Sequence, residues 1–185
     1  MNAWLYRASL AALLVATLST AARADRLIHV GFGGGFAIPT GTGSDSIKTG
    51  VEGRAYVLIQ PPGFPFAIRT GISLQRFGIK NSSKAATMLG GNIGARLSLP
   101  TGRVRPYVTV AVGAFKVDGL DPLHVATPEG KETKLELDAG VGSEIRFSEQ
   151  LNGFIEAKFY NVYTDKGWQG ANSARFIPIS FGLIF

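Results

Sequence analysis

Twelve charged side chains stand at alternate positions of otherwise apolar stretches, and they are the residues of this sequence that could support chemistry. They are Glu52, Arg54, Arg69, Arg96, Arg105, Lys134, Glu136, Asp138, Glu144, Arg146, Glu156 and Lys158. Seven are basic and five are acidic, so the set is close to neutral. It could form a catalytic carboxylate set, a filter for a narrow conduit, or a structural ion network. We favour the network, because charges removed from water are tolerated when they are paired.

The sequence carries no recognisable catalytic or metal-binding motif. It has no cysteine and two histidines, His29 and His124. Neither histidine has a serine and a carboxylate placed to complete a triad, and two histidines so far apart make a poor metal site. The glycine run over residues 31–35 is not followed by the Gly-Lys-Ser/Thr of a phosphate loop. We therefore expect no catalytic residue, no cofactor and no metal.

Eight segments with period-two alternation must position the charges. They cover residues 27–38, 50–60, 66–77, 87–99, 104–117, 133–147, 153–163 and 175–185. In the clearest of them, Leu135 and Leu137 alternate with Glu136 and Asp138. Such alternation is typical of strands with one apolar and one polar face, and each segment has about 11 residues.

The links between the segments alternate in length. The short links cover residues 61–65, 100–103 and 148–152, and the longer ones cover residues 40–49, 78–86, 118–132 and 164–174. Strands of about 9–11 tilted residues cross a hydrocarbon core, and a sheet in lipid must close so that no edge is unpaired. The sequence thus predicts an all-β fold, an eight-stranded antiparallel up-and-down transmembrane β-barrel with short periplasmic turns and longer extracellular loops. Its apolar faces would point outward.

The N-terminus is typical of a targeting segment. Arg7 precedes an apolar stretch over residues 8–18, and Ala22 and Ala24 supply the small residues of a cleavage site. The stretch is too short for a spanning helix, which needs about 20 residues. We expect residues 1–24 to be a signal peptide, cleaved after Ala24, and residues 25–185 to form one barrel domain.

Two stretches resemble a known family. The chain ends Ile177-Pro178-Ile179-Ser180-Phe181-Gly182-Leu183-Ile184-Phe185, and the fifth segment contains Arg105-Pro106-Tyr107-Val108. They resemble the small Gram-negative outer-membrane barrels of the OmpA/OmpX type. The resemblance implies localisation in the cell outer membrane after export through the periplasm. It also implies an assembly signal in the last strand, read by the barrel-assembly machinery, with Phe181, Leu183 and Phe185 as its residues.

The expected function is that of a non-enzymatic outer-membrane barrel that contributes to envelope structure or to loop-mediated binding and adhesion. The expected partners are outer-membrane lipid, lipopolysaccharide, the assembly machinery and an extracellular ligand at loops 40–49, 118–132 and 164–174. Nucleic acid is not expected, because the net charge is only +6 and no Lys/Arg run exists.

Three alternatives remain open: a lipid A-modifying enzyme, a narrow channel, and a soluble secreted β-barrel that binds a ligand. Barrels of the lipid A deacylase type carry a His-x-Ser pair on a late strand. The corresponding stretch here, Lys158-Phe159-Tyr160-Asn161-Val162-Tyr163, contains neither residue.

Two local hypotheses concern the strands that close the barrel. Pro178 lacks an N–H, so we expect a bulge or an unpaired position in the last strand. The glycines at positions 31, 33, 35 and 182 would meet at closure. The room that they leave could admit the guanidinium of Arg54.

Overall fold

The computed structural model describes most of the chain beyond its N-terminus. The described residues are 27–41, 44–61, 63–81, 83, 85–99, 102–118, 132–168 and 171–185, with the side chains of 118, 132, 164–168 and 171–172 excepted. The predicted signal peptide, His124 and most of the predicted loop 118–132 lie outside this set. Among the described residues, no helix is long and apolar enough to cross a membrane.

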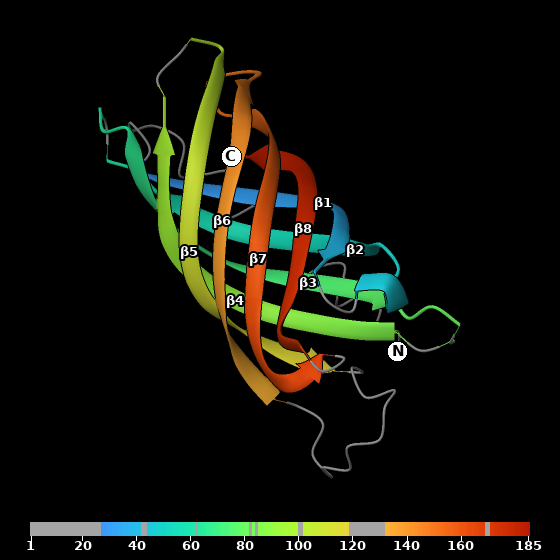
Figure 1. The fold of residues 1–185 in the computed structure, drawn as a ribbon. Helices are drawn as coiled ribbons and strands as arrows, with labels where there is room; N and C mark the ends of the chain where they lie inside the picture. The colour runs from blue at the N-terminus through green and yellow to red at the C-terminus, as the bar shows by residue number, and fades with distance from the viewer. Residues whose placement is uncertain are drawn as a thin grey trace, which may run out of the picture.

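Eight antiparallel strands form a closed barrel (Figure 1). The strands are β1 (Ile28–Thr40), β2 (Gly50–Ile59), β3 (Phe66–Gly78), β4 (Ala85–Ser98), β5 (Val104–Asp118), β6 (Glu132–Arg146), β7 (Asn152–Trp168) and β8 (Ala171–Ile184), with one 3₁₀ turn at Ser44–Ser46. Each strand pairs with the next, and β8 pairs with β1. The predicted up-and-down barrel is confirmed. We call the end with the short links 60–65, 99–103 and 147–151 the turn end, and the opposite end the loop end.

The strand bounds agree with the alternation except at the last hairpin. β2 and β3 each end within one residue of the predicted position. The predicted loop 164–174 is wrong, because β7 continues to Trp168 and β8 begins at Ala171, with a register shift between Tyr163 and Trp168. A strand that extends beyond the hydrocarbon needs only backbone pairing, and its sequence need not alternate.

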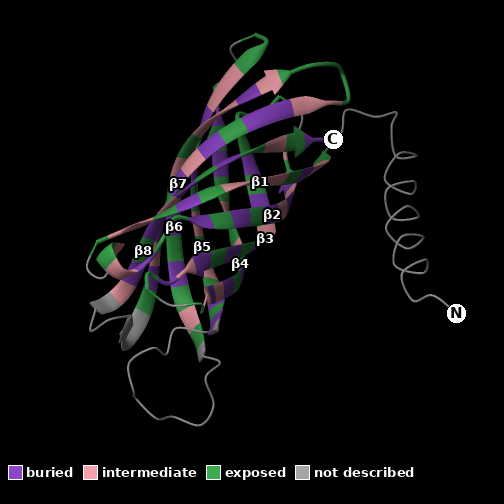
Figure 2. Ribbon diagram, turned by 90° about the vertical axis from the view of Figure 1, so that its right-hand side faces the viewer, coloured by how far each residue is buried: buried purple, intermediate pink, exposed green. Residues whose placement is uncertain are grey.

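Apolar side chains point outward along every strand. Leu135 and Val141 are 54% and 61% exposed, whereas Glu136 and Asp138 between them are 1% and 5% exposed. Figure 2 shows the same alternation of exposed and buried positions along the strands. A continuous apolar outer surface of this extent is stable against hydrocarbon and not against water. It excludes the alternative of a soluble barrel with an apolar lumen.

Four aromatic rings fill the lumen at the loop end. Phe77, Phe115, Tyr160 and Phe176, here called the aromatic plug, are each at most 1% exposed. Tyr160 stacks on Phe176 with ring centroids 5.0 Å apart, and Phe77 meets Phe176 edge-on at 5.4 Å. A smaller apolar cluster at the turn end contains Tyr56, Leu58, Ala67, Phe154 and Ile184. The sequence predicts a lumen filled by charged side chains. The structure limits these side chains to the region between the two apolar clusters.

Pro178 interrupts the pairing between β7 and β8. The ladder runs in one register from Asn152 to Tyr163, but the two pairs expected opposite Pro178 and Ile177 are missing from it. On its other side Pro178 pairs with Ala37 in an unbroken ladder. The hypothesis of an unpaired position is confirmed, and that of a bulge is wrong, because the register does not shift at this point.

The glycines of β1 and β8 meet as expected, but they do not admit Arg54. Gly33 pairs directly with Gly182. A Cβ on Gly33 would lie 2.6 Å from Cζ of Phe154, and one on Gly31 would collide with the ring of Tyr56. The hypothesis is wrong, since aromatic rings lie beside Gly31, Gly33 and Gly182, the backbone of β8 lies against Gly35, and the guanidinium of Arg54 binds Glu52 and Glu156 instead.

The charged lumen as candidate functional site

Most of the charges identified from the alternation lie inside the barrel. Nine are buried: Glu52, Arg54, Arg69, Arg96, Glu136, Asp138, Glu144, Glu156 and Lys158. Arg105 and Lys134 are half-buried, and Arg146 is exposed at the end of β6. The structure therefore brings nine of the charges together between the two apolar clusters, and it leaves Arg146 at the rim.

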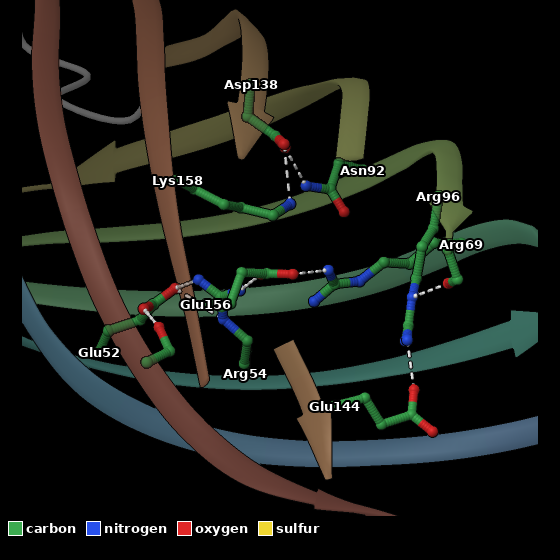
Figure 3. Close-up of polar contacts among 11 residues, drawn as sticks. Glu52, Arg54, Arg69, Asn92, Arg96, Asp138, Glu144, Glu156 and Lys158 are labelled. Atoms are coloured by element: carbon green, nitrogen blue, oxygen red, sulfur yellow. Dashed lines mark hydrogen bonds and ion pairs between the residues drawn. The ribbon is translucent and has the colours of Figure 1, made fainter. Parts of the chain in front are cut away.

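Glu156 on β7 is the centre of the largest group of ion pairs, which we call the arginine cluster. Its Oε1 accepts a hydrogen bond from Arg54 Nη1, and its Oε2 accepts one from Arg69 Nη1 at 2.6 Å (Figure 3). The guanidinium of Arg69 also lies over the ring of Tyr56, 3.8 Å from the centroid. Two guanidinium groups thus share one carboxylate, and a ring supports one of them.

Glu52 on β2 completes the arginine cluster. Its Oε1 accepts hydrogen bonds from Arg54 Nη2 at 2.6 Å and from Gln75 Nε2 at 3.3 Å. Its Oε2 accepts one from the hydroxyl of Ser180 on β8. Because Arg54 lies between Glu52 and Glu156, the cluster ties β2 to β7 and β8 across the lumen. The sequence places these residues on inward faces, but it does not tell which of them pair.

A second ion pair joins β4 to β6. Arg96 Nη2 donates to Glu144 Oε2, and Arg96 Nε donates to the hydroxyl of Ser98 at 3.1 Å. The guanidinium lies over the ring of Tyr107, 3.9 Å from its centroid. As with Arg69 and Tyr56, one face of the cation is covered by an aromatic ring, so little of it needs water.

The third polar group lies closer to the aromatic plug. Lys158 Nζ and Asn92 Nδ2 each donate to Asp138, at 2.7 Å. Glu136, two residues before Asp138 on the same face, is 1% exposed, and its Oε1 has no hydrogen-bond partner among the described residues. Two carboxylates stand here beside one cation, whereas the arginine cluster has two carboxylates and two cations.

Several polar partners were not identified from the sequence. Asn92, Gln75 and Ser180 each bind a buried carboxylate. Tyr56 and Tyr107 each cover a guanidinium. All five stand on the inward parity of their strands, where the alternation places them, but the alternation does not tell which of them bind a charged group.

The described side chains of the lumen form ion pairs and hydrogen bonds with one another. The acidic groups of the arginine cluster already accept hydrogen bonds, and the hydroxyl of Ser180 donates to Glu52. No three His, Asp or Glu side chains of that part of the chain gather as metal ligands. His29 is half-buried near the start of β1.

Comparisons with known proteins agree with the barrel. Residues 8–185 match the family model described as outer membrane protein beta-barrel domain. The structure is similar to Neisserial surface protein A, with a TM-score of 0.63 and 12% identity, covering 86% of this chain and 96% of the other. It is also similar to the outer membrane protein OprG from Pseudomonas aeruginosa, with a TM-score of 0.51 and 9% identity, covering 85% and 94%. No curated protein sequence matches the chain.

Proposed function

The chain belongs to the outer membrane protein beta-barrel domain family, and from that premise we propose that it is a closed, non-enzymatic barrel that supports the envelope and presents its loop end for binding. A Gram-negative outer-membrane location follows from the family. With the termini at the turn end, the short turns face the periplasm and the loop end faces outward.

The aromatic plug carries the proposal that the barrel does not conduct. Eight strands enclose a lumen that side chains can fill completely. Here Phe77, Phe115, Tyr160 and Phe176 occupy its loop end in mutual ring contact. Ile47 of the first loop, 6% exposed, packs into the same cluster, and it forms a bridge with Ile79. An ion would have to displace these rings, which supports a scaffold over a narrow channel.

The ion pairs of the lumen support a structural role over a catalytic one. General acid–base chemistry needs a group within reach of a substrate and free to exchange a proton. Glu52 and Glu156 instead hold arginine side chains inside the barrel wall. A lipid A-modifying enzyme is disfavoured for a further reason. Its substrate would reach the barrel from the membrane, and the outward faces of the described strands are almost entirely apolar.

Two further features support the proposal: the first loop, and the outward residues at the end of the chain. The described residues 44–49 of the first loop contain the Ser44–Ser46 turn and the Ile47–Ile79 bridge, so this part of the loop can serve as a contact surface. In the last strand, Phe181, Leu183 and Phe185 all face outward and are 58%, 41% and 47% exposed. An outward apolar row of this kind fits the proposed signal for the assembly machinery.

Planar-bilayer recording of the purified barrel tests the closed lumen. We expect no discrete conductance steps from the wild-type protein. The double variant Phe115→Ala and Phe176→Ala, which removes two of the four rings of the plug, serves as the comparison under identical conditions. Reproducible steps from the wild-type barrel would refute the scaffold and favour the channel. Mass spectrometry of lipid A from cells with and without the protein tests the enzyme, and a changed acylation pattern would favour it.

A further inference from the structure

Four basic side chains gather on the outer face of the barrel where the apolar belt ends at the loop end. They are Lys48, Arg76, Lys80 and Lys116, here called the basic rim, and all four are exposed. On β3, Arg76 follows Leu74, which faces the hydrocarbon and is 48% exposed. On β5, Lys116 stands two residues beyond Ala114 on the same face. The basic rim therefore lies at the boundary between the apolar belt and the polar loop end.

The register brings Arg76 and Lys116 within reach of one ligand. Arg76 pairs with Thr87 of β4, and Lys116 pairs with Leu89 of the same strand. The two residues are thus two strands apart and offset by two positions, which places their Cα atoms about 12 Å apart. Since both side chains are long and flexible, their charged ends can converge on one headgroup.

The first loop adds Lys48 and Lys80 to the same face. The backbone N–H of Lys48 donates to Gly78 O at 2.8 Å, and that of Lys80 donates to Ser46 O at 2.9 Å. Gly78 stands on the face of Arg76, and a Cβ on it would lie 3.4 Å from Cδ of Lys48. The side chain of Lys48 therefore covers Gly78, which stands two residues beyond Arg76 on the same face.

The charges of the basic rim are not neutralised by the described side chains around them. None of the ion pairs among the described residues includes a member of the rim. Asp45 is the one exposed carboxylate among the described side chains of the loop end. On β8, by contrast, Arg175 donates to the side chain of Asn161 at 3.0 Å. Asp118 ends β5 opposite Thr87, the residue that also pairs with Arg76. The four cations of the rim outnumber Asp45 and Asp118, so this wall has a local excess of positive charge among the described residues.

We propose that the basic rim binds the phosphate groups of a glycolipid in the outer leaflet. Arg76 is the principal contact, since a guanidinium can bind a phosphate through two parallel hydrogen bonds, and Lys116 supplies a second charge. The lipid's acyl chains would lie along the apolar belt below. The proposal rests on the orientation given above, in which the loop end faces outward.

Lipid binding to the folded barrel in detergent micelles tests the proposal. The probes are lipid A with two phosphates and the same lipid with both phosphates removed, and native mass spectrometry measures the bound fraction. We expect the wild-type protein to bind the phosphorylated lipid about tenfold more tightly. The double variant Arg76→Gln and Lys116→Gln should lose this preference, and Lys48→Gln with Lys80→Gln should reduce it about threefold.

The matched control removes two exposed cations from the turn end. Arg103→Gln with Arg146→Gln changes the net charge equally and should keep the preference, because both residues lie at the opposite end of the barrel. Heat-modifiable migration on a gel shows that each variant is folded. Equal binding of the two lipids by the wild type, or an equal loss in the control, would overturn the proposal. So would displacement of the lipid by inorganic pyrophosphate at the same concentration, which would indicate a soluble ligand. Conductance is recorded in a separate experiment. The proposal of a closed lumen can therefore be refuted while that of lipid binding is supported, and lipid binding can be refuted while the closed lumen is supported.

Discussion

Glu136 and Glu156 lie on neighbouring strands of one lumen, and each is 1% exposed, yet their surroundings differ. Both carboxylate oxygens of Glu156 accept hydrogen bonds from guanidinium groups, those of Arg54 and Arg69. Oε1 of Glu136 has no partner among the described residues, and its strand neighbour on β7 is Val162, a member of the apolar cluster at the loop end. Burial alone therefore does not tell whether a charged residue stabilises this barrel.

The difference teaches how the lumen is filled along its axis. Between the two ends, the arginine cluster joins strands through charged groups that satisfy one another. At the loop end, the aromatic plug fills the space by ring contact, and Glu136 stands beside it with few partners. A buried carboxylate stabilises a fold only when its partners compensate for the lost hydration. Three substitutions, given from the largest expected effect to the smallest, test this comparison.

The largest effect is expected for Glu156→Gln. It keeps the shape of the side chain but removes the charge between Arg54 and Arg69, so two cations remain buried with less compensation. We expect the free energy of unfolding, measured by denaturant titration of the vesicle-inserted barrel, to fall by about 4 kcal/mol. Glu149→Gln, in the exposed turn before β7, should change it by less than about 0.5 kcal/mol. A loss below about 1 kcal/mol at Glu156 would mean that the arginine cluster is not a main source of stability.

The second substitution compares the aromatic plug with the arginine cluster. Phe176 contacts three other rings of the plug, so Phe176→Ala leaves a cavity at its centre. We expect a loss of about 3 kcal/mol in the same titration, and about 1 kcal/mol for Phe176→Leu, which retains most of the volume. Equal losses for the two variants would show that filling the volume is not enough to stabilise this end and that the aromatic ring itself is required.

The smallest effect, and the opposite sign, is expected for Glu136→Gln. Glu136 is buried beside the carboxylate of Asp138, so an amide in its place avoids the like-charge repulsion between the two groups and can donate a hydrogen bond toward Asp138. The free energy of unfolding should rise by about 1 kcal/mol. A loss similar to that of Glu156→Gln would show that Glu136 is held by partners of its own, and the contrast between the two glutamates would not stand.

Much of the fold could be predicted from the sequence because lipid and lumen impose opposite requirements on alternate residues. Leu135 and Glu136 are assigned to opposite faces by that rule alone, and the structure agrees. The extension of the last hairpin to Trp168 could not be predicted, since those residues lie where the rule no longer applies.

The contacts within the lumen were less predictable. Arg54 and Glu156 are 102 residues apart in sequence, and their contact depends on the tilt and stagger of the strands, which alternation does not report. The plug was missed for a different reason. Phe77, Phe115 and Phe176 stand at inward positions, but an inward aromatic residue was not expected in a lumen assigned to charges.

Pro178 on β8 affects which pair of neighbouring strands is weakened in the closed barrel. On the β1 side, Phe185 and Val30 exchange both backbone hydrogen bonds, so by alternation the nitrogen of Pro178 faces β7. The joint between first and last strands therefore keeps ten consecutive pairs, while the gap falls inside the final hairpin. If the ladder between β7 and β8 opened locally, these two strands would still be joined by their hairpin. The pairing of β1 with β8, which closes the barrel, would be kept.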